Sequence, residues 1–188
     1  MYQVNRTKYS ETLRALADNQ VDGAGSLTEA GSGYDPRFAF AYAASTKGPN
    51  LNGKYPANNF AANSENCTLF YLRLSEIYLI HAEAEARKAG GNLEDAVTSL
   101  NTIRVRAGVD EFEVSDKATL LNQIRQEKML ELFFENGESW FDLVRYGRLG
   151  DISAFAEKAS LTSTTQFILP IPLNVLTANT LLVKNPGY

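Results

Sequence analysis

The feature that most constrains the fold is the stretch 73–108, in which two segments with helical periodicity flank the glycine pair 90–91. We predict a first helix over 69–89 that ends at the glycines, because glycine adopts the left-handed C-terminal conformation without steric cost. Asn92 can then cap a second helix over 93–106, whose apolar residues recur on one face. Two helices joined by so short a link are expected to pack as an antiparallel hairpin.

This hairpin fits one degenerate tetratricopeptide-type repeat. With Ala96 at the small position of the second helix, Ala84 falls on the small position of the first helix, and Leu100 falls on the large apolar position. Alanines recur through the first helix and predict close approach by a neighbouring element: Ala82, Ala84, Ala86 and Ala89. The pattern therefore predicts a mainly α fold built from tetratricopeptide-like hairpins.

The whole chain, 1–188, is predicted to be a single domain, because its composition shows no second block. Its segments are a loop-rich part at about 21–66, a helical core at about 69–150 and an extended C-terminal tail at about 166–188, which two prolines should keep extended. Outside the hairpin, further helices are predicted over 10–18, 116–135 and 139–146.

The loop-rich part contains the best candidates for ligand recognition. Aromatic residues alternate with alanines over 38–43, which predicts a short β element. The following residues, 45–64, are rich in Gly, Pro and Asn and predict a long connection, which is usually functional or disordered. Sugar rings stack on aromatic rings and pair their hydroxyls with amides. The candidate ligand-binding residues are Tyr34, Tyr42, Tyr55, Asn58, Asn59 and Phe60.

Three glutamates, Glu127, Glu131 and Glu135, are spaced four residues apart and should form a ridge along one predicted helix. Adjacent like charges repel, so the ridge needs cationic partners. Arginines in neighbouring segments can supply them: Arg73, Arg104, Arg106, Arg125, Arg145 and Arg148. We interpret the ridge as a polar network between helices, with a glycoside-hydrolysing carboxylate pair or an oxygen-ligand metal site as alternatives. Glu76 and Glu83 receive the same interpretation.

Composition and single residues argue against several function classes. The chain has 18 Lys and Arg against 22 Asp and Glu, a net charge of -4 and no basic stripe, so nucleic acid is not an expected partner. His81 is the only histidine and Cys67 the only cysteine, which excludes a two-histidine metal site and a cysteine-rich zinc site. We therefore expect no enzymatic activity, catalytic residue, bound metal or cofactor.

Several longer motifs resemble the C-terminal domain of the SusD/RagB family of surface nutrient-binding lipoproteins from Bacteroidetes. The motifs are RLSEIYLIHAEA at 73–84, LNTIRVRAGV at 100–109, IRQEKMLELFFENGESWFDLVRYGRLGD at 124–151 and LPIPLNVLTANTLLVKNPGY at 169–188. YDPRF at 34–38 also looks like the family's Asp-Pro-Arg element. The resemblance covers about four-fifths of the chain in family order.

The resemblance implies a non-catalytic protein on the external face of the outer membrane. It would capture oligosaccharide or polysaccharide for a SusC-like TonB-dependent transporter. The chain looks like the C-terminal portion of such a protein, so we expect membrane contact only through a lipid anchor that this chain lacks. The alternative is a protein-interaction scaffold or peptide-binding module of the same transporter complex, with no sugar site in this portion. Either way, the charged motif residues are expected to be scaffold.

Overall fold

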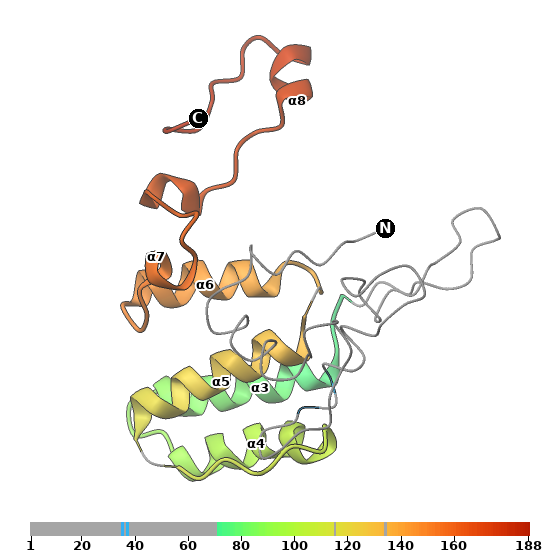
Figure 1. Cartoon of the computed structure of the whole chain (residues 1–188), viewed down its shortest axis with the longest axis vertical. Coiled ribbons are helices and arrows are strands. Elements are labelled where there is room, and N and C mark those ends of the chain that lie inside the picture. Colours follow the sequence, from blue (N-terminus) through green and yellow to red (C-terminus); the bar gives the residue numbers. More distant parts are fainter. Residues whose placement is uncertain (1–34, 36, 38–70, 115, 134) are drawn as a thin grey trace, which may run out of the picture.

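The computed structural model describes residues 35, 37, 71–114, 116–133 and 135–188, and within these ranges it is helical and has no strand. The elements are α3 (Leu74–Arg87), α4 (Leu93–Arg106), α5 (Lys117–Glu131), α6 (Glu138–Leu149), α7 (Ala154–Glu157), the 3-10 helix η2 (Thr164–Phe167) and α8 (Leu173–Ala178). Figure 1 shows α3, α4, α5 and α6 stacked in tiers, with the segment that carries α8 extending away from them. The predicted mainly α fold class is confirmed.

The helical hairpin forms as its sequence predicts. Gly90 has a positive φ of 69°, and the Asn92 side chain accepts a hydrogen bond from the backbone N–H of Glu94, so the stop and the cap are both in place. The second helix has the predicted bounds, whereas the described part of the first begins at Leu74 and ends at Arg87. The hairpin is therefore set by local chemistry at its turn.

The main core lies where α3, α4 and α5 meet, with one residue from α6. Ala96 and Leu100 are fully buried in it, as expected from the repeat pattern. Ala82 and Ala86 are buried as well, whereas Ala84 is exposed, so close approach at Ala84 was a wrong prediction. Further fully buried members come from α3, α5 and α6: Leu79, Leu120, Ile124 and Tyr146.

The next two helices differ from the sequence prediction at their ends. Asp116 caps α5 by accepting from the Thr119 N–H, but the helix stops at Glu131 rather than at residue 135. In the other helix, α6, the glycine at 147 does not end the element; a Cβ there would lie 2.9 Å from the Cβ of Ala154. This glycine allows α7 to pack closely, and α6 continues to Leu149 before Gly150 terminates it with a φ of 80°.

The prediction of a fully extended tail over 166–188 is wrong, because it contains α8. Pro172 lies at the N-cap position directly before this helix, where the N–H that proline lacks needs no partner within the helix. The rest of the tail folds back on itself. Asn185 donates to the carbonyl of Leu169 at 2.8 Å, and the Tyr188 hydroxyl donates to the carbonyl of Ile168 at 3.0 Å.

Some predicted elements lie outside the described residues: the helix at 10–18, the β element at 38–43 and most of the loop-rich part at 21–66. Among the helices that are described, none combines the length and the apolar character needed to cross a bilayer.

The core analysis predicts that Leu100→Ala destabilises the fold by about 2–5 kcal/mol, because Leu100 is fully buried and the truncation leaves a cavity. Val105→Ala on the same helix is the matched control, since Val105 is 57% exposed and its loss should cost less than about 0.5 kcal/mol. Urea unfolding followed by circular dichroism measures both. Equal effects of the two substitutions would contradict the placement of α4.

Candidate functional site

The six residues predicted to bind ligand all lie outside the described residues, so their arrangement stays a prediction. They are Tyr34, Tyr42, Tyr55, Asn58, Asn59 and Phe60.

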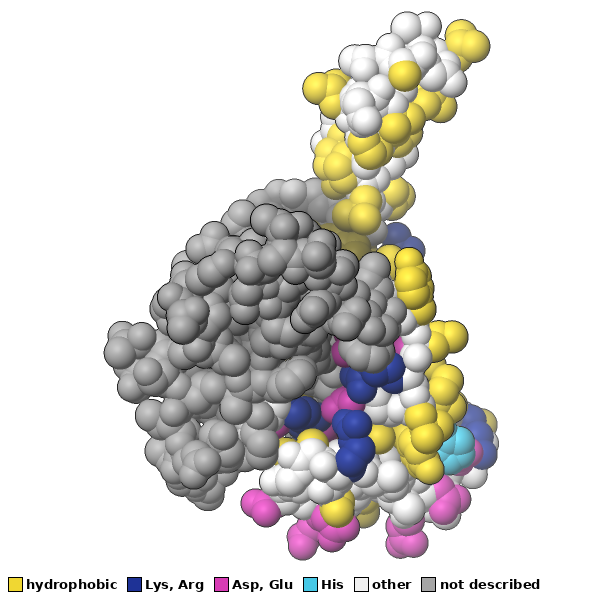
Figure 2. Space-filling view, turned by 90° about the vertical axis from the view of Figure 1, so that its right-hand side faces the viewer, with side chains coloured by type: hydrophobic (Ala, Val, Ile, Leu, Met, Phe, Trp, Pro, Cys, Tyr) yellow, Lys and Arg dark blue, Asp and Glu magenta, His cyan; other side chains and the backbone are white. Residues whose placement is uncertain are grey.

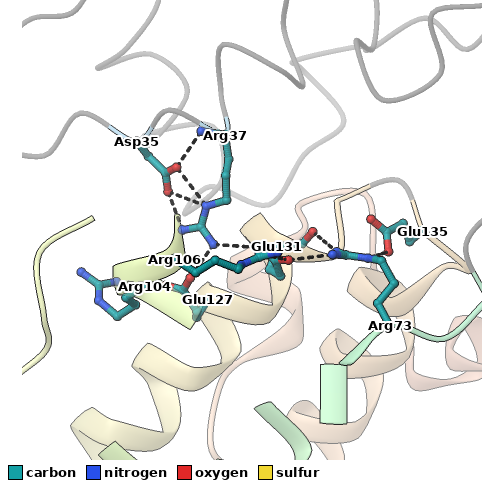
Figure 3. Close-up of polar contacts among 8 residues, drawn as sticks. All are labelled: Asp35, Arg37, Arg73, Arg104, Arg106, Glu127, Glu131 and Glu135. Carbon is teal, nitrogen blue, oxygen red and sulfur yellow. Dashed lines mark hydrogen bonds and ion pairs between the residues drawn. The ribbon is translucent and has the colours of Figure 1, made fainter. Parts of the chain in front are cut away.

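The glutamate ridge on α5 is buried and paired with arginines from other segments (Figure 3). Glu127, which is fully buried, accepts from Arg104 at 3.0 Å and from Arg37 at 2.5 Å. Arg104 comes from α4, so this pair ties α4 to α5. The interpretation of the ridge as a polar network between helices is confirmed at this position.

Glu131 lies one turn further along and accepts from three guanidiniums. The distances are 2.8 Å from Arg73, 2.5 Å from Arg106 and 3.2 Å from Arg37. Arg73 also reaches Glu135 at 2.7 Å and donates to the backbone carbonyl of Glu131 at 2.7 Å. Because the last carbonyls of a helix lack partners within the helix, the bond to the Glu131 carbonyl closes the end of α5, and Arg73 also neutralises the ridge.

Arg37 is the member of this network that the sequence analysis missed. Its guanidinium bridges Glu127 and Glu131, which lie 90 and 94 residues away, and Asp35 holds it in place. Asp35 is buried and accepts from the Arg37 backbone N–H at 2.9 Å and from Arg37 Nη2 at 2.6 Å. The signal was the YDPRF motif, in which an aspartate two residues before an arginine can orient it.

The arginines hold the Glu131 carboxyl in its charged form. Burial alone would raise the pKa of Glu131, but hydrogen bonds from Arg73 and the positive charges of Arg106 and Arg73 outweigh it and lower that pKa to about 2. The pKa of Arg37 is raised in turn, because its bonds to Asp35 and Glu127 outweigh its own burial. Glu131 therefore stays ionised and neutralised over the physiological range.

A second polar cluster joins α3 to α6. Glu83 accepts from Arg145 in a two-pronged contact and from Arg87 at 2.6 Å, and its pKa is lowered to about 2 because these bonds outweigh burial. The guanidinium carbons of Arg87 and Arg145 lie 4.8 Å and 4.7 Å from the ring centre of the buried Tyr146. Lys128 adds a buried bond to Asp142 at 2.8 Å.

Three arginines expected to neutralise the ridge pair elsewhere. Arg125 lies 3.4 Å from Glu157 of α7, Arg145 binds Glu83 and Asp142, and Arg148 lies over the Phe167 ring at 5.8 Å. Arg125 lies on α5 itself and points towards α7, whereas the rotation of α6, which spacing along the sequence does not specify, turns Arg145 and Arg148 away from the ridge. The pairing of Arg125, Arg145 and Arg148 with the ridge was therefore a wrong prediction.

The network leaves little for acid–base or metal chemistry. Glu127 and Glu131 project side by side from one helix and each is bound by guanidiniums, whereas glycoside hydrolysis needs two carboxyls that flank a cleft. No group of three or more His, Cys, Asp or Glu side chains within the described ranges is arranged to hold a metal ion. His81, half-exposed, links α3 to α4 through a 2.9 Å contact between its Nδ1 and the Ser99 hydroxyl.

An apolar groove of about 490 Å³ lies on the outer face of α6, and we call it the α6 groove. Its defining residues are Trp140, Phe141, Arg145, Arg148, Phe167 and Leu169. The wall opposite α6 is held by a small second core, in which the aromatic residues Trp140 and Phe167 pack against Leu143, Ala154 and Leu161. The sequence analysis did not find this groove, since its walls come from segments about 20 residues apart.

The network predicts that Glu131→Gln costs about 3–5 kcal/mol of unfolding free energy at neutral pH, because it leaves three guanidiniums without their shared charge. A carboxyl with a lowered pKa stabilises the fold above its unfolded value of 4.5 and loses this contribution as the pH falls towards about 2. The difference between wild type and variant should therefore shrink below pH 4.5, as measured by urea unfolding.

Glu113→Gln is the control for this series, since Glu113 is exposed and lies outside the network. It should leave the unfolding free energy within about 0.5 kcal/mol of wild type at each pH. A Glu131→Gln effect that stays constant from neutral to acid pH would contradict the charge pairing.

Comparison with known proteins identifies a family and similar solved structures for this chain. The family model described as the SusD family matches residues 3–188. A SusD-like protein from Bacteroides fragilis NCTC 9343 is similar in structure, with a TM-score of 0.50 and 22% identity over 83% of this chain and 39% of that chain. A SusD superfamily protein from Parabacteroides distasonis ATCC 8503 gives a TM-score of 0.48 and 28% identity, over 61% of this chain and 26% of that chain.

No curated protein matches the sequence. The chain spans less than half of the length of either solved protein. The match over 3–188 covers nearly the whole chain, and the chain belongs to the SusD family.

Proposed function

We propose that the protein is a non-catalytic, cell-surface glycan-binding protein that captures oligosaccharide for a TonB-dependent outer-membrane transporter. The observation that carries the proposal is the SusD family match over residues 3–188, because membership supports a role in carbohydrate binding for nutrient uptake in general. The external face of the outer membrane is the location that fits this role, and a SusC-like transporter is the partner that fits it.

The state of the buried carboxylates supports the non-catalytic part of the proposal. A general acid needs a pKa near the working pH, whereas the pKa values of Glu131 and Glu83 are lowered to about 2 by their arginine partners. Guanidinium groups are also paired with the carboxylate oxygens of Glu131 and Glu83 that would have to contact a substrate. These groups suit a rigid scaffold better than proton transfer.

Sugar recognition is assigned to the loop-rich part by its chemistry. The rings of Tyr55 and Phe60 would stack on the apolar C–H faces of a sugar, and Asn58 and Asn59 would orient its hydroxyls. Stacking of about 0.5–1.5 kcal/mol per ring gives a weak total from two or three rings. Weak binding suits a protein that passes its ligand on.

A second candidate function is supported by the exposed apolar surface. Leu74 on α3 is 71% exposed, and in the tail Leu181 and Val183 are 88% and 83% exposed. Figure 2 shows hydrophobic side chains along the C-terminal segment and down one edge of the helical part, beside the lone histidine. Apolar surface of this extent is typical of a protein-interaction face, so an interaction scaffold in the transporter complex is the alternative.

Isothermal calorimetry with a panel of plant and host glycans tests the capture proposal. Binding heat should appear with at least one glycan and fall sharply in Tyr55→Ala and Phe60→Ala, because each removes a stacking ring. Tyr71→Ala is the matched control, since Tyr71 is 74% exposed and lies outside the candidate set, and it should bind as wild type does.

Heat that both loop substitutions leave unchanged would remove the assignment of Tyr55 and Phe60. An absence of heat with every glycan, together with binding of the chain to the transporter, would favour the interaction scaffold instead.

A further inference from the structure

The α6 groove is lined by one face of a helix and by a wall that packing holds in place. Residues 140, 141, 144, 145, 148 and 149 line it, which is the spacing of one continuous face of a helix. The opposite wall is anchored, because the Phe167 ring stacks on Phe155 with centres 5.9 Å apart and an angle of 19° between the planes. The buried side of α6 carries Asp142 and Tyr146, so the helix cannot rotate without breaking the polar cluster.

Three aromatic rings line the groove. Trp140 is partly exposed and Phe141 is 57% exposed on α6, and Phe167 comes from η2. Exposed rings with fixed positions provide flat apolar surfaces on which the C–H face of a sugar ring can stack. Since both elements are held by the second core, these surfaces need no rearrangement before binding.

The charge of the groove has a single sign. Two arginines line it and no carboxylate does. Arg145 already binds Glu83 and Asp142, whereas Arg148 is exposed and has no acidic partner in the part of the chain that the structure describes. The carbon of its guanidinium lies 5.8 Å from the centre of the Phe167 ring.

We propose that the α6 groove is a binding site for an acidic sugar residue, in which a uronic acid ring stacks on Trp140 and Phe141 and its carboxylate binds Arg148. A guanidinium can hold a carboxylate through two parallel hydrogen bonds, so Arg148 supplies the selectivity for charge. The inference rests on the proposed glycan-binding function and names a substrate class, acidic oligosaccharide, for residues other than the loop candidates.

Trp140 makes this site directly observable, because it is the only tryptophan in the chain. The experiment titrates the full 188-residue protein with a galacturonic acid hexamer and follows tryptophan emission, with a neutral maltose-type hexamer as the parallel ligand. The acidic hexamer should produce a saturable change in emission. The neutral hexamer should require at least about tenfold higher concentration, since it lacks the charge-assisted bonds.

Arg148→Gln should weaken binding of the acidic hexamer by at least about tenfold, and Arg148→Lys should restore part of the loss, because lysine keeps the charge but not the two-pronged geometry. Lys117→Gln is the matched control, since it removes one exposed positive charge from α5, outside the groove, and should bind as wild type does. Phe141→Ala should weaken both hexamers together, because stacking does not depend on charge. Circular dichroism confirms that each variant is folded.

No emission change with the acidic hexamer, or equal responses to both hexamers that Arg148→Gln leaves unaltered, would overturn the assignment. An emission change with a leucine- and glutamate-rich helical peptide in place of any sugar would overturn it in favour of a polypeptide ligand. If calorimetry shows glycan binding that depends on Tyr55 and Phe60 while Trp140 emission stays constant, the α6 site fails and the proposed function stands.

Discussion

The pairing of guanidinium with carboxylate along α5 is the interaction on which the rest of the structure depends. Burying a carboxylate alone costs several kcal/mol, so a ridge of buried glutamates is stable only while its arginines are in place. Those arginines come from the residues before α3, from α4 and from position 37. The glutamates of α5 therefore hold three other parts of the chain in place. Loss of one arginine would leave a buried carboxylate without part of its neutralising charge.

Part of this could be predicted from the sequence. The hairpin could be predicted because the glycine pair and the asparagine cap act locally. The burial of Ala96 and Leu100 could also be predicted. Glu127 and Glu131 lie one turn apart on α5 as their spacing of four residues predicts, whereas Glu135 lies beyond the end of the helix. Which arginines pair with the ridge could not be predicted from the sequence. Arg145 and Arg148 turn away from α5 because packing of Tyr146 and Phe167 sets the rotation of α6.

The bridging role of Arg37 and the α6 groove escaped prediction for a related reason. Arg37 lies 90 residues from Glu127, and Leu169 lies 20 residues beyond Leu149, so neither contact leaves a periodic signal in the sequence. The short helix α8 escaped because proline was taken as a helix breaker, whereas Pro172 lies at the N-cap position, where the N–H that it lacks needs no partner within the helix. Local rules were reliable where neighbours in sequence decide the conformation, and failed where distant segments do.

The two faces of α6 show how scaffold and recognition divide in this protein. The inner face is committed to structure, since Asp142 binds Lys128 and Arg145, and the Tyr146 ring lies between two guanidiniums. Because these ion pairs hold the helix rigidly, the rings on the outer face keep fixed positions without a ligand. A groove that is organised in advance loses less entropy on binding, so in the proposed site a few weak stacking contacts and one charged bond would be enough for selective capture with ready release.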